Sequence, residues 1–265
     1  MRGEQLGKAC GATVKQAATA SECKAADIVV AVKRVNEQLL SSLRQAGRPW
    51  VFDAVDFYPQ PRSYSWSKSE AVGWVKSQLK HLAPAAVLWP NKRMREDCDT
   101  GLPGLVLPHH HRPGIKLNPV RPKVLAVGYE GAAPYLGQWR EAIESECQRR
   151  GWSFVVNPAN LADLDIVLAF RDGMGYVPFH WKSNVKLANA HGSGTPFVGQ
   201  REIGYVETAT GAEYWAEERK DLTMCFDWLE TQDTREVVRD RFLQRAYPVE
   251  RAAADLTEFL KGGVR

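Results

Sequence analysis

The sequence predicts an α/β protein with two Rossmann-like domains, the N-terminal one reduced in size. Short apolar segments alternate with segments of helical spacing, which is typical of parallel sheets covered by helices on both faces. The alternation stops at residues 108–123, a segment rich in proline, and then restarts, which indicates a hinge between two domains. The 265 residues suffice for two small domains, because domains typically contain about 100 to 150 residues.

The first predicted domain covers residues 1–118. We expect its strands at 27–32, 50–55, 85–89 and 105–107, and its helices at 34–45 and 67–81. In the second helix apolar residues recur at spacings of three and four, and Ser67 with Glu70 fits a capping box. The chain begins with a helix-like segment, which leaves open whether this domain lacks a first strand.

The second predicted domain covers residues 119–265. We expect strands at 123–127, 154–156, 165–170 and 197–199, helices at 136–147 and 182–191, and mostly helices in the last fifty residues. Gly151 is expected to stop the first of these helices, since glycine readily adopts the left-handed conformation that ends a helix.

Composition argues against several classes of protein. No segment approaches the roughly 20 apolar residues that a membrane-spanning helix needs, and the first residues lack the apolar block of a secretory signal. The five cysteines are scattered, odd in number and outside any metal-ligand spacing, so we expect reduced thiols and no metal site. These observations predict a cytoplasmic protein.

The net charge of +4 is unevenly distributed. Residues 1–118 carry 17 basic and 10 acidic side chains, a net of +7, whereas residues 119–265 carry 18 and 21, a net of −3. The difference in net charge indicates that the two halves have different roles, and chance variation is the alternative explanation.

Ligands of open parallel sheets bind beyond the carboxyl ends of the strands, so residues that follow strands are the candidates for a site. Arg171 follows the strand predicted at 165–170, and a helix is expected to begin near Lys182, Ser183 and Asn184. Ser183 is expected to cap that helix, and Lys182 and Lys186 are expected on one helical face. Cations beside helix N–H groups suit a pyrophosphate.

The segment from Lys186 to Pro196 contains a basic helix residue and a turn of small residues, and Phe197-Val198, Gly204 and Glu207 follow it. In this order the segment resembles the donor-binding region of glycosyltransferases of the GT-B fold, similar to families 1 and 4. The resemblance implies two Rossmann-like domains that face a cleft, with donor binding in the second. It further implies a nucleoside-diphosphate sugar as donor, expected to be a UDP-sugar, no obligatory metal or cofactor, and a final helix that crosses back onto the first domain.

Many GT-B enzymes contact the sugar and the ribose with two glutamates eight positions apart. The matching residues here are Trp181 and Asn189, so the identity of the sugar and the stereochemical outcome remain open. Glu207 matches a family glutamate and is expected at the donor. The resemblance also draws attention to Gly128, Glu130 and Gly131, which follow the first strand of the second domain. Glu130 either approaches a sugar hydroxyl or caps a helix.

The first domain contains the candidates for catalysis and acceptor binding. Asp53 and Asp56 lie at or after a predicted strand, and Asp56 is the preferred general base for an inverting reaction, with a cap or turn as the alternative for both. His109 starts a run of three histidines at the hinge, where a role with substrate, ordinary packing and metal binding are the alternatives. The expected acceptor-binding residues follow strands or belong to an aromatic loop: Lys33, Arg34, Tyr58 and Arg93.

The basic first half favours a nucleic-acid acceptor, for instance a hydroxymethylated base in double-stranded DNA, as in a compact phage enzyme acting in the host cytoplasm. A glycosyltransferase acting on a cell-envelope glycan or a small metabolite is one alternative. A non-catalytic module that binds nucleotide-sugars or nucleic acid is another. The sequence leaves the oligomeric state open.

Overall fold

The structure, a computed structural model, describes residues 2–59, 65–173 and 175–263. The chain forms two compact units, which are described separately. The first unit contains residues 1–109, 175–183 and 249–265, and the second contains residues 110–174 and 184–248. The predicted domains, in contrast, were continuous segments joined at residue 118.

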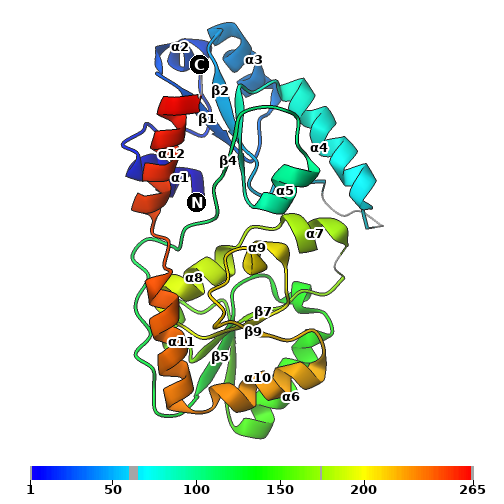
Figure 1. The fold of residues 1–265 in the computed structure, drawn as a ribbon, viewed down its shortest axis with the longest axis vertical. Helices are drawn as coiled ribbons and strands as arrows, with labels where there is room; N and C mark the ends of the chain where they lie inside the picture. Colours follow the sequence, from blue (N-terminus) through cyan, green and yellow to red (C-terminus); the bar gives the residue numbers. More distant parts are fainter. Residues whose placement is uncertain (1, 60–64, 174, 264–265) are drawn as a thin grey trace. The chain divides into compact units, whose positions relative to one another are not determined.

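A four-stranded parallel sheet in the order β1-β2-β3-β4 forms the centre of the first unit (Figure 1). Its strands are β1 (Val29–Val32), β2 (Trp50–Asp53), β3 (Ala86–Trp89) and β4 (Gly104–Val106). The helices that accompany them are α1 (Arg2–Ala9), α2 (Ala20–Ala25), α3 (Glu37–Ala46), α4 (Lys68–Leu82) and α5 (Lys92–Asp97). The predicted helical start and the Ser67–Glu70 capping box are both confirmed.

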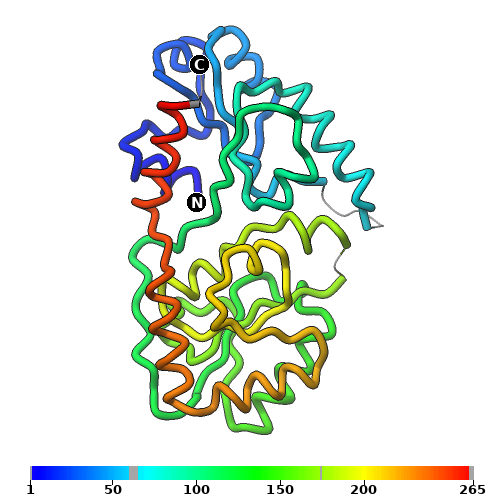
Figure 2. Tube along the Cα trace, viewed as in Figure 1, coloured from blue at the N-terminus to red at the C-terminus, as the bar shows by residue number. Residues whose placement is uncertain are grey.

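Two helices from the C-terminal half of the chain complete the first unit. They are α7 (Tyr176–Trp181) and α12 (Val249–Gly263). Figure 2 shows α12 beside α1, and Cys10 Sγ donates to the carbonyl of Ala253 at 3.8 Å. The expected return of the final helix to the first unit is therefore confirmed. The fully buried Trp181 anchors α7 in the core of this unit.

The second unit contains a five-stranded parallel sheet in the order β6-β5-β7-β8-β9. The strands are β5 (Ala126–Tyr129), β6 (Ser153–Val156), β7 (Ile166–Ala169), β8 (Phe197–Gly199) and β9 (Tyr214–Trp215). The helices are α6 (Trp139–Arg150), α8 (Val185–Ser193), α9 (Ile203–Val206), α10 (Arg219–Leu229) and α11 (Gln232–Gln244), and two short 3-10 helices lie at Ala133–Leu136 and Leu161–Asp163. In Figure 1 the sheet lies between two contacting helix pairs, α6 with α10 and α8 with α11.

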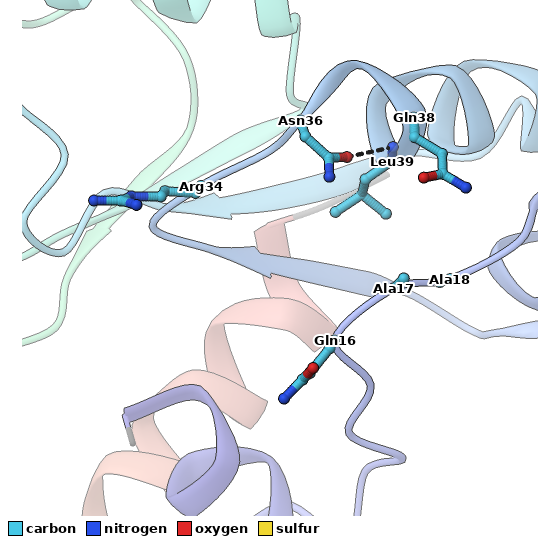
Figure 3. A pocket seen from close by; sticks show the side chains of 7 residues that line it. All are labelled: Gln16, Ala17, Ala18, Arg34, Asn36, Gln38 and Leu39. Carbon is cyan, nitrogen blue, oxygen red and sulfur yellow. Dashed lines mark hydrogen bonds between the residues drawn. The ribbon is translucent and has the colours of Figure 1, made fainter.

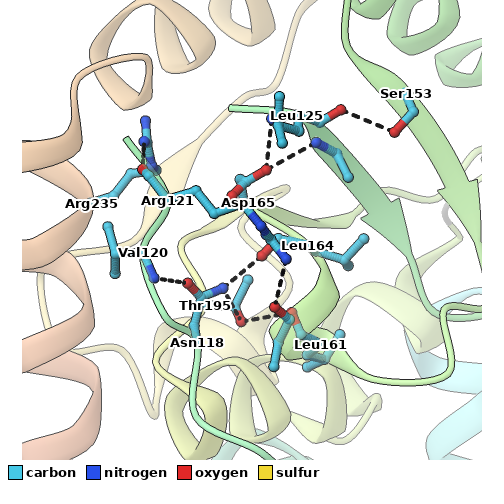
Figure 4. Close-up of polar contacts among 12 residues, drawn as sticks. Asn118, Val120, Arg121, Leu125, Ser153, Leu161, Leu164, Asp165, Thr195 and Arg235 are labelled. Carbon is cyan, nitrogen blue, oxygen red and sulfur yellow. Dashed lines mark hydrogen bonds and ion pairs between the residues drawn. The ribbon is translucent and has the colours of Figure 1, made fainter. Parts of the chain in front are cut away.

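Two predictions in the second unit are wrong in position. The strand expected at 123–127 begins at Ala126, and the helix expected at 182–191 is α8, which begins three residues later, at Val185. The first shift has a clear cause, because the Asp165 carboxylate accepts hydrogen bonds from the N–H groups of Leu125 and Ala126 at 2.7 and 2.9 Å (Figure 4). Gly151, with φ of 68°, ends α6 as predicted.

Among the described residues, no helix is both long and apolar enough to cross a membrane.

Candidate functional site

The order of strands in the second unit indicates where a ligand would bind. The chain passes from β5 outward to β6, then returns to β7 on the other side of β5. In an open parallel sheet the crevice at such a reversal, beyond the carboxyl ends of the strands, is the preferred ligand site. Glu130 directly follows β5, and Arg171 follows β7 after one residue.

Lys186 lies in the first turn of α8, and its ammonium is 4.0 Å from the centre of the Tyr129 ring. A cation over an aromatic face is attracted by the ring, which favours this position of the side chain. The N-terminal end of a helix attracts anions through its N–H groups and its dipole. Lys186 therefore adds a full positive charge to an end of a helix that already favours phosphate.

The predicted capping role of Ser183 is wrong. The residue that precedes α8 is Asn184, which makes no side-chain capping bond, while Ser183 is buried in the first unit. The prediction that Lys182 and Lys186 lie on one face of a helix is wrong too, because the backbone at Lys182 is not helical, with ψ of 143°. Lys182 therefore belongs to the first unit and Lys186 to the second.

Glu130 is held by two neighbours in the second unit. Its Oε1 is 3.5 Å from Nη2 of Arg112, and its Oε2 accepts a hydrogen bond from Nδ2 of Asn189 at 3.1 Å. Asn189 in turn accepts from the backbone N–H of Arg112 at 2.9 Å. The three residues form a closed polar network next to the end of β5. Arg112, which the sequence analysis did not single out, lies within the proline-rich segment, where hydropathy patterns give no signal.

Arg171 is engaged within the protein. Its Nε donates to Oε1 of Glu202 at 3.0 Å, and its guanidinium is 5.8 Å from the ring centre of Tyr135. Burial by itself would lower the pKa of Arg171, but the negative charge of the buried Glu202 carboxylate outweighs burial and raises this pKa. Sequence reasoning missed Glu202, although its place three residues after β8 could have marked it.

Two glycines that were predicted at the donor, Gly128 and Gly131, have roles within the fold. A Cβ at Gly128 would lie 2.4 Å from Leu164, so this glycine permits close packing of the sheet. Gly131, with φ of 148°, donates its N–H to Oδ1 of Asn157. Glu207 is exposed at the C-terminal end of α9.

A second cluster of charges lies in the first unit, at the carboxyl ends of β1 and β2. Oδ1 of Asp56 is 3.3 Å from Nζ of Lys182, and Oδ2 is 3.2 Å from Nζ of Lys33. The Lys182 ammonium also donates to the hydroxyl of Tyr58 at 2.9 Å. Burial by itself would raise the pKa of Asp56, but the positive charges of Lys182 and Lys33 outweigh the effect of burial and lower this pKa.

The backbone at this cluster is strained. Lys33 and Asp56 have φ values of 68° and 52°, a region that non-glycine residues occupy at a cost of about 1–3 kcal/mol. Such strain is often found at functional sites. Contacts among their side chains thus bring Lys33, Asp56, Tyr58 and Lys182 together as one cluster of the first unit.

Asp53 does not fit the predicted role of general base. Its side chain is fully buried and pairs with Nε of Arg2 at 2.9 Å. Burial raises the pKa of this carboxyl despite the opposing charge of Arg2. An inaccessible carboxylate cannot reach an acceptor hydroxyl, so Asp53 instead fastens α1 to the sheet.

The other residues of the first unit that were predicted to bind the acceptor or take part in catalysis are Arg34, Arg93 and His109. The contacts described above do not bring these three residues together. Arg34 is exposed and lines a hollow of about 50 Å³ with Asn36 and Gln16 (Figure 3). Arg93 is half-buried in α5, and His109 is half-buried at the last position of the unit's first segment. In the part of the chain that the structure describes, no three His, Cys, Asp or Glu side chains gather as metal ligands would.

The turn at Gly194-Thr195-Pro196 has a structural role at the opposite edge of the sheet. Gly194 ends α8 with φ of 69°, and the buried Thr195 hydroxyl donates to the carbonyl of Leu161 at 3.2 Å. Nδ2 of Asn118 donates to Thr195 Oγ1 and to the carbonyl of Leu164 (Figure 4). The turn thereby fixes the amino ends of the strands rather than touching a ligand at their carboxyl ends.

Glu213 and His191 form a buried pair in the second unit, 2.9 Å apart. Burial tends to raise the pKa of Glu213, but the hydrogen bonds from His191 and from the Thr210 N–H lower it below 4.5. Because the pKa is lower in the folded protein than in the unfolded chain, the ionised carboxylate stabilises the fold above pH 4.5. This contribution is lost as the pH falls through the folded pKa.

We therefore expect the stability difference between the wild type and Glu213→Gln to be constant above about pH 5.5 and to shrink steadily below pH 4.5. Urea unfolding at a series of pH values measures it. Glu258→Gln, at an exposed position of α12, is the control and should show no such trend. A Glu213→Gln difference that grows on acidification would contradict the assignment.

Comparisons with known proteins agree with this architecture. No protein-family profile and no curated protein sequence matches the chain. Several solved structures are similar in fold. HepE from Anabaena, solved with UDP and glucose, has a TM-score of 0.59 and 13% identity, with 91% of this chain and 80% of HepE covered.

Two further structures show the same similarity. The trehalose-6-phosphate synthase OtsA has a TM-score of 0.60 and 11% identity over 92% of this chain and 75% of its own. AviGT4, a glycosyltransferase involved in avilamycin A biosynthesis, has a TM-score of 0.54 and 14% identity over 96% of this chain and 80% of its own. With its two parallel sheets and these structural neighbours, the chain has the GT-B fold of glycosyltransferases.

Proposed function

We propose that the protein is a glycosyltransferase that moves a sugar from a nucleoside-diphosphate sugar, expected to be a UDP-sugar, to an acceptor hydroxyl. The observation that carries the proposal is the placement of Lys186 and Glu130 at the strand reversal of the second unit. A cation beside a helix N-terminus suits a diphosphate, and a neighbouring carboxylate suits hydroxyl groups. The UDP in the structure of HepE, which has the same fold, supports this choice of donor.

In the reaction, the bond from the anomeric carbon to the diphosphate breaks, and a bond from that carbon to the acceptor oxygen forms. The diphosphate leaves with additional negative charge, which the ammonium of Lys186 and the N-terminus of α8 stabilise. The acceptor hydroxyl loses a proton, which needs a base. Asp56 is the candidate in the first unit, because it follows β2 and a quarter of its side chain remains exposed.

The experiment that tests the proposal incubates the purified protein with labelled UDP- and GDP-sugars and measures slow release of sugar or its transfer. We expect turnover with a UDP-sugar. If no donor is turned over while nucleotides still bind, the alternative of a non-catalytic binding module is correct instead.

Asp56→Asn is expected to lower the rate of transfer by about 100-fold or more, since general-base catalysis contributes about 10²–10⁴-fold. The affinity for UDP should not change, because Asp56 belongs to the first unit and the donor residues to the second. Rates and UDP titrations of Asp56→Asn and of Asp27→Asn, a change at an exposed position, measure the effect. A normal rate in Asp56→Asn would exclude this carboxylate as the base.

For the acceptor we propose a hydroxymethylated base in double-stranded DNA. The net charge of +7 on residues 1–118 and the exposed Arg34 support a polyanion, although the Lys33 ammonium is partly neutralised by Asp56. DNA binding through phosphates should weaken steeply as salt increases. Affinity that is unaffected by salt, or transfer to a small sugar acceptor but not to hydroxymethylated DNA, would favour a glycan or metabolite.

A further inference from the structure

The segment at residues 175–183 belongs to the first unit, although the chain on both sides of it belongs to the second. It contains α7, in which Val177 and Trp181 are buried among the apolar side chains of the first unit's core. Lys182 follows α7 directly, and a quarter of its side chain is exposed. Because ordering such a short segment costs conformational entropy, the segment needs contacts in the first unit that offset this cost.

Asp97, the last residue of α5, is the polar anchor of this segment. Its side chain is almost fully buried, and Oδ2 accepts hydrogen bonds from the Tyr176 hydroxyl and, at 3.0 Å, from Nε1 of Trp181. The other oxygen, Oδ1, is 2.7 Å from Nζ of Lys68. Tyr176 and Trp181 are the first and last residues of α7, so one carboxylate holds both ends of the helix.

A further contact fixes the backbone at Lys182 itself. The buried Asn91 donates from Nδ2 to the carbonyl of Lys182 at 3.2 Å. With the backbone held there, the ammonium reaches the Tyr58 hydroxyl at 2.9 Å and Oδ1 of Asp56 at 3.3 Å. Oδ1 is itself buried, and the Lys182 ammonium therefore faces the oxygen that is turned away from solvent.

The other oxygen of Asp56 remains available to a ligand. A quarter of the Asp56 side chain is exposed although Oδ1 is buried, so a hydroxyl can reach the carboxylate at Oδ2. Oδ2 is 3.2 Å from Nζ of Lys33, and a carboxylate oxygen has about two lone-pair positions, which leaves one for the hydroxyl. A carboxylate held at its buried oxygen presents the other oxygen in a fixed direction, as proton transfer requires.

We propose that the segment at residues 175–183 completes the catalytic site of the first unit, with Lys182 as the positioning residue of the base Asp56. Asp97 acts one step further away, because it holds the helix that precedes Lys182. The inference rests on the proposed function, in which Asp56 takes the proton of the acceptor hydroxyl. Among the described residues, the charged and titratable groups around Asp56 are Lys33 after β1, Asp53 of β2 with its partner Arg2, and Lys182 with Tyr58.

The pH dependence of the transfer rate tests the inference. Lys182 lowers the pKa of Asp56, so in Lys182→Met this pKa should rise and the acidic limb of the rate profile should move to higher pH. On the plateau, where Asp56 is ionised in both proteins, kcat should still fall about tenfold or more, because the carboxylate is no longer oriented. Lys182→Arg, which keeps the charge, should retain the wild-type limb. Lys80→Met, at an exposed lysine of α4, is the control and should match the wild type.

Asp97→Asn tests the anchor, because the amide keeps one acceptor oxygen but loses the charge. Its acidic limb should lie between those of the wild type and Lys182→Met. Glu96→Gln, at the exposed neighbouring position, should leave the limb unchanged. A wild-type limb in Asp97→Asn would mean that Asp97 does not hold Lys182 in place.

Two measurements keep the test decisive for slow or unstable variants. Carbon-13 NMR of the carboxyl groups, with the Asp56 signal assigned from Asp56→Asn, follows the same pKa without turnover. Circular dichroism checks folding, and Lys182→Gln takes the place of a Lys182→Met protein that does not fold. A plateau kcat in Lys182→Met equal to that of the wild type would overturn the inference and leave the proposed function intact. A wild type that turns over no donor would overturn both.

Discussion

Asp165→Ala is expected to lower the free energy of unfolding by about 3–5 kcal/mol, the usual cost of removing one partner from a buried ion pair. The carboxylate is fully buried, and it accepts hydrogen bonds from the backbone N–H groups of Leu125 and Ala126 and from Nη1 of Arg121 (Figure 4). Alanine would leave all three donors without their acceptor at the point where β5 and β7 begin. Urea unfolding followed by circular dichroism measures the loss.

Asp163→Ala is the matched control, because Asp163 is two residues away but exposed. Its effect should stay within about 0.5 kcal/mol, as for most surface substitutions. Equal losses in the two variants would mean that the Asp165 network does not hold the strands of the second unit together.

Lys186→Ala is expected to weaken UDP binding by about 10- to 100-fold, which corresponds to the loss of a charged hydrogen bond of about 1.5–3 kcal/mol. Lys186 sits over Tyr129 at the start of α8, where it adds charge to a helix end that attracts phosphate. Binding to the variant should also depend less on salt, since one cation fewer meets the diphosphate. Calorimetric titration at two salt concentrations measures both effects.

Lys220→Ala removes an exposed lysine of α10 in the same unit and should bind UDP like the wild type. Arg171→Ala is a poor test of donor binding, because it would leave the buried Glu202 carboxylate without its partner and destabilise the fold. If Lys186→Ala retained wild-type affinity, the diphosphate would not bind at the start of α8.

Local patterns in the chain were enough to predict most elements. The strand at 197–199, the Ser67–Glu70 capping box and the stop at Gly151 follow from the sequence, because each depends on residues within a few positions of one another. Two parallel sheets and the return of the last helix were predictable as well, the former from the alternation of strands and helices and the latter from the resemblance to GT-B enzymes.

The partners of the charged side chains depend on the tertiary structure. Arg2 meets Asp53 across 51 positions, Glu130 meets Asn189 across 59, and Lys182 meets Tyr58 across 124. These contacts turned a predicted base into a structural ion pair, separated two lysines expected on one helix, and gave Glu130 a fixed orientation. Helical spacing and strand ends indicate which residues can reach an edge of a sheet, but burial and pairing between distant segments determine which charges are left to meet a ligand.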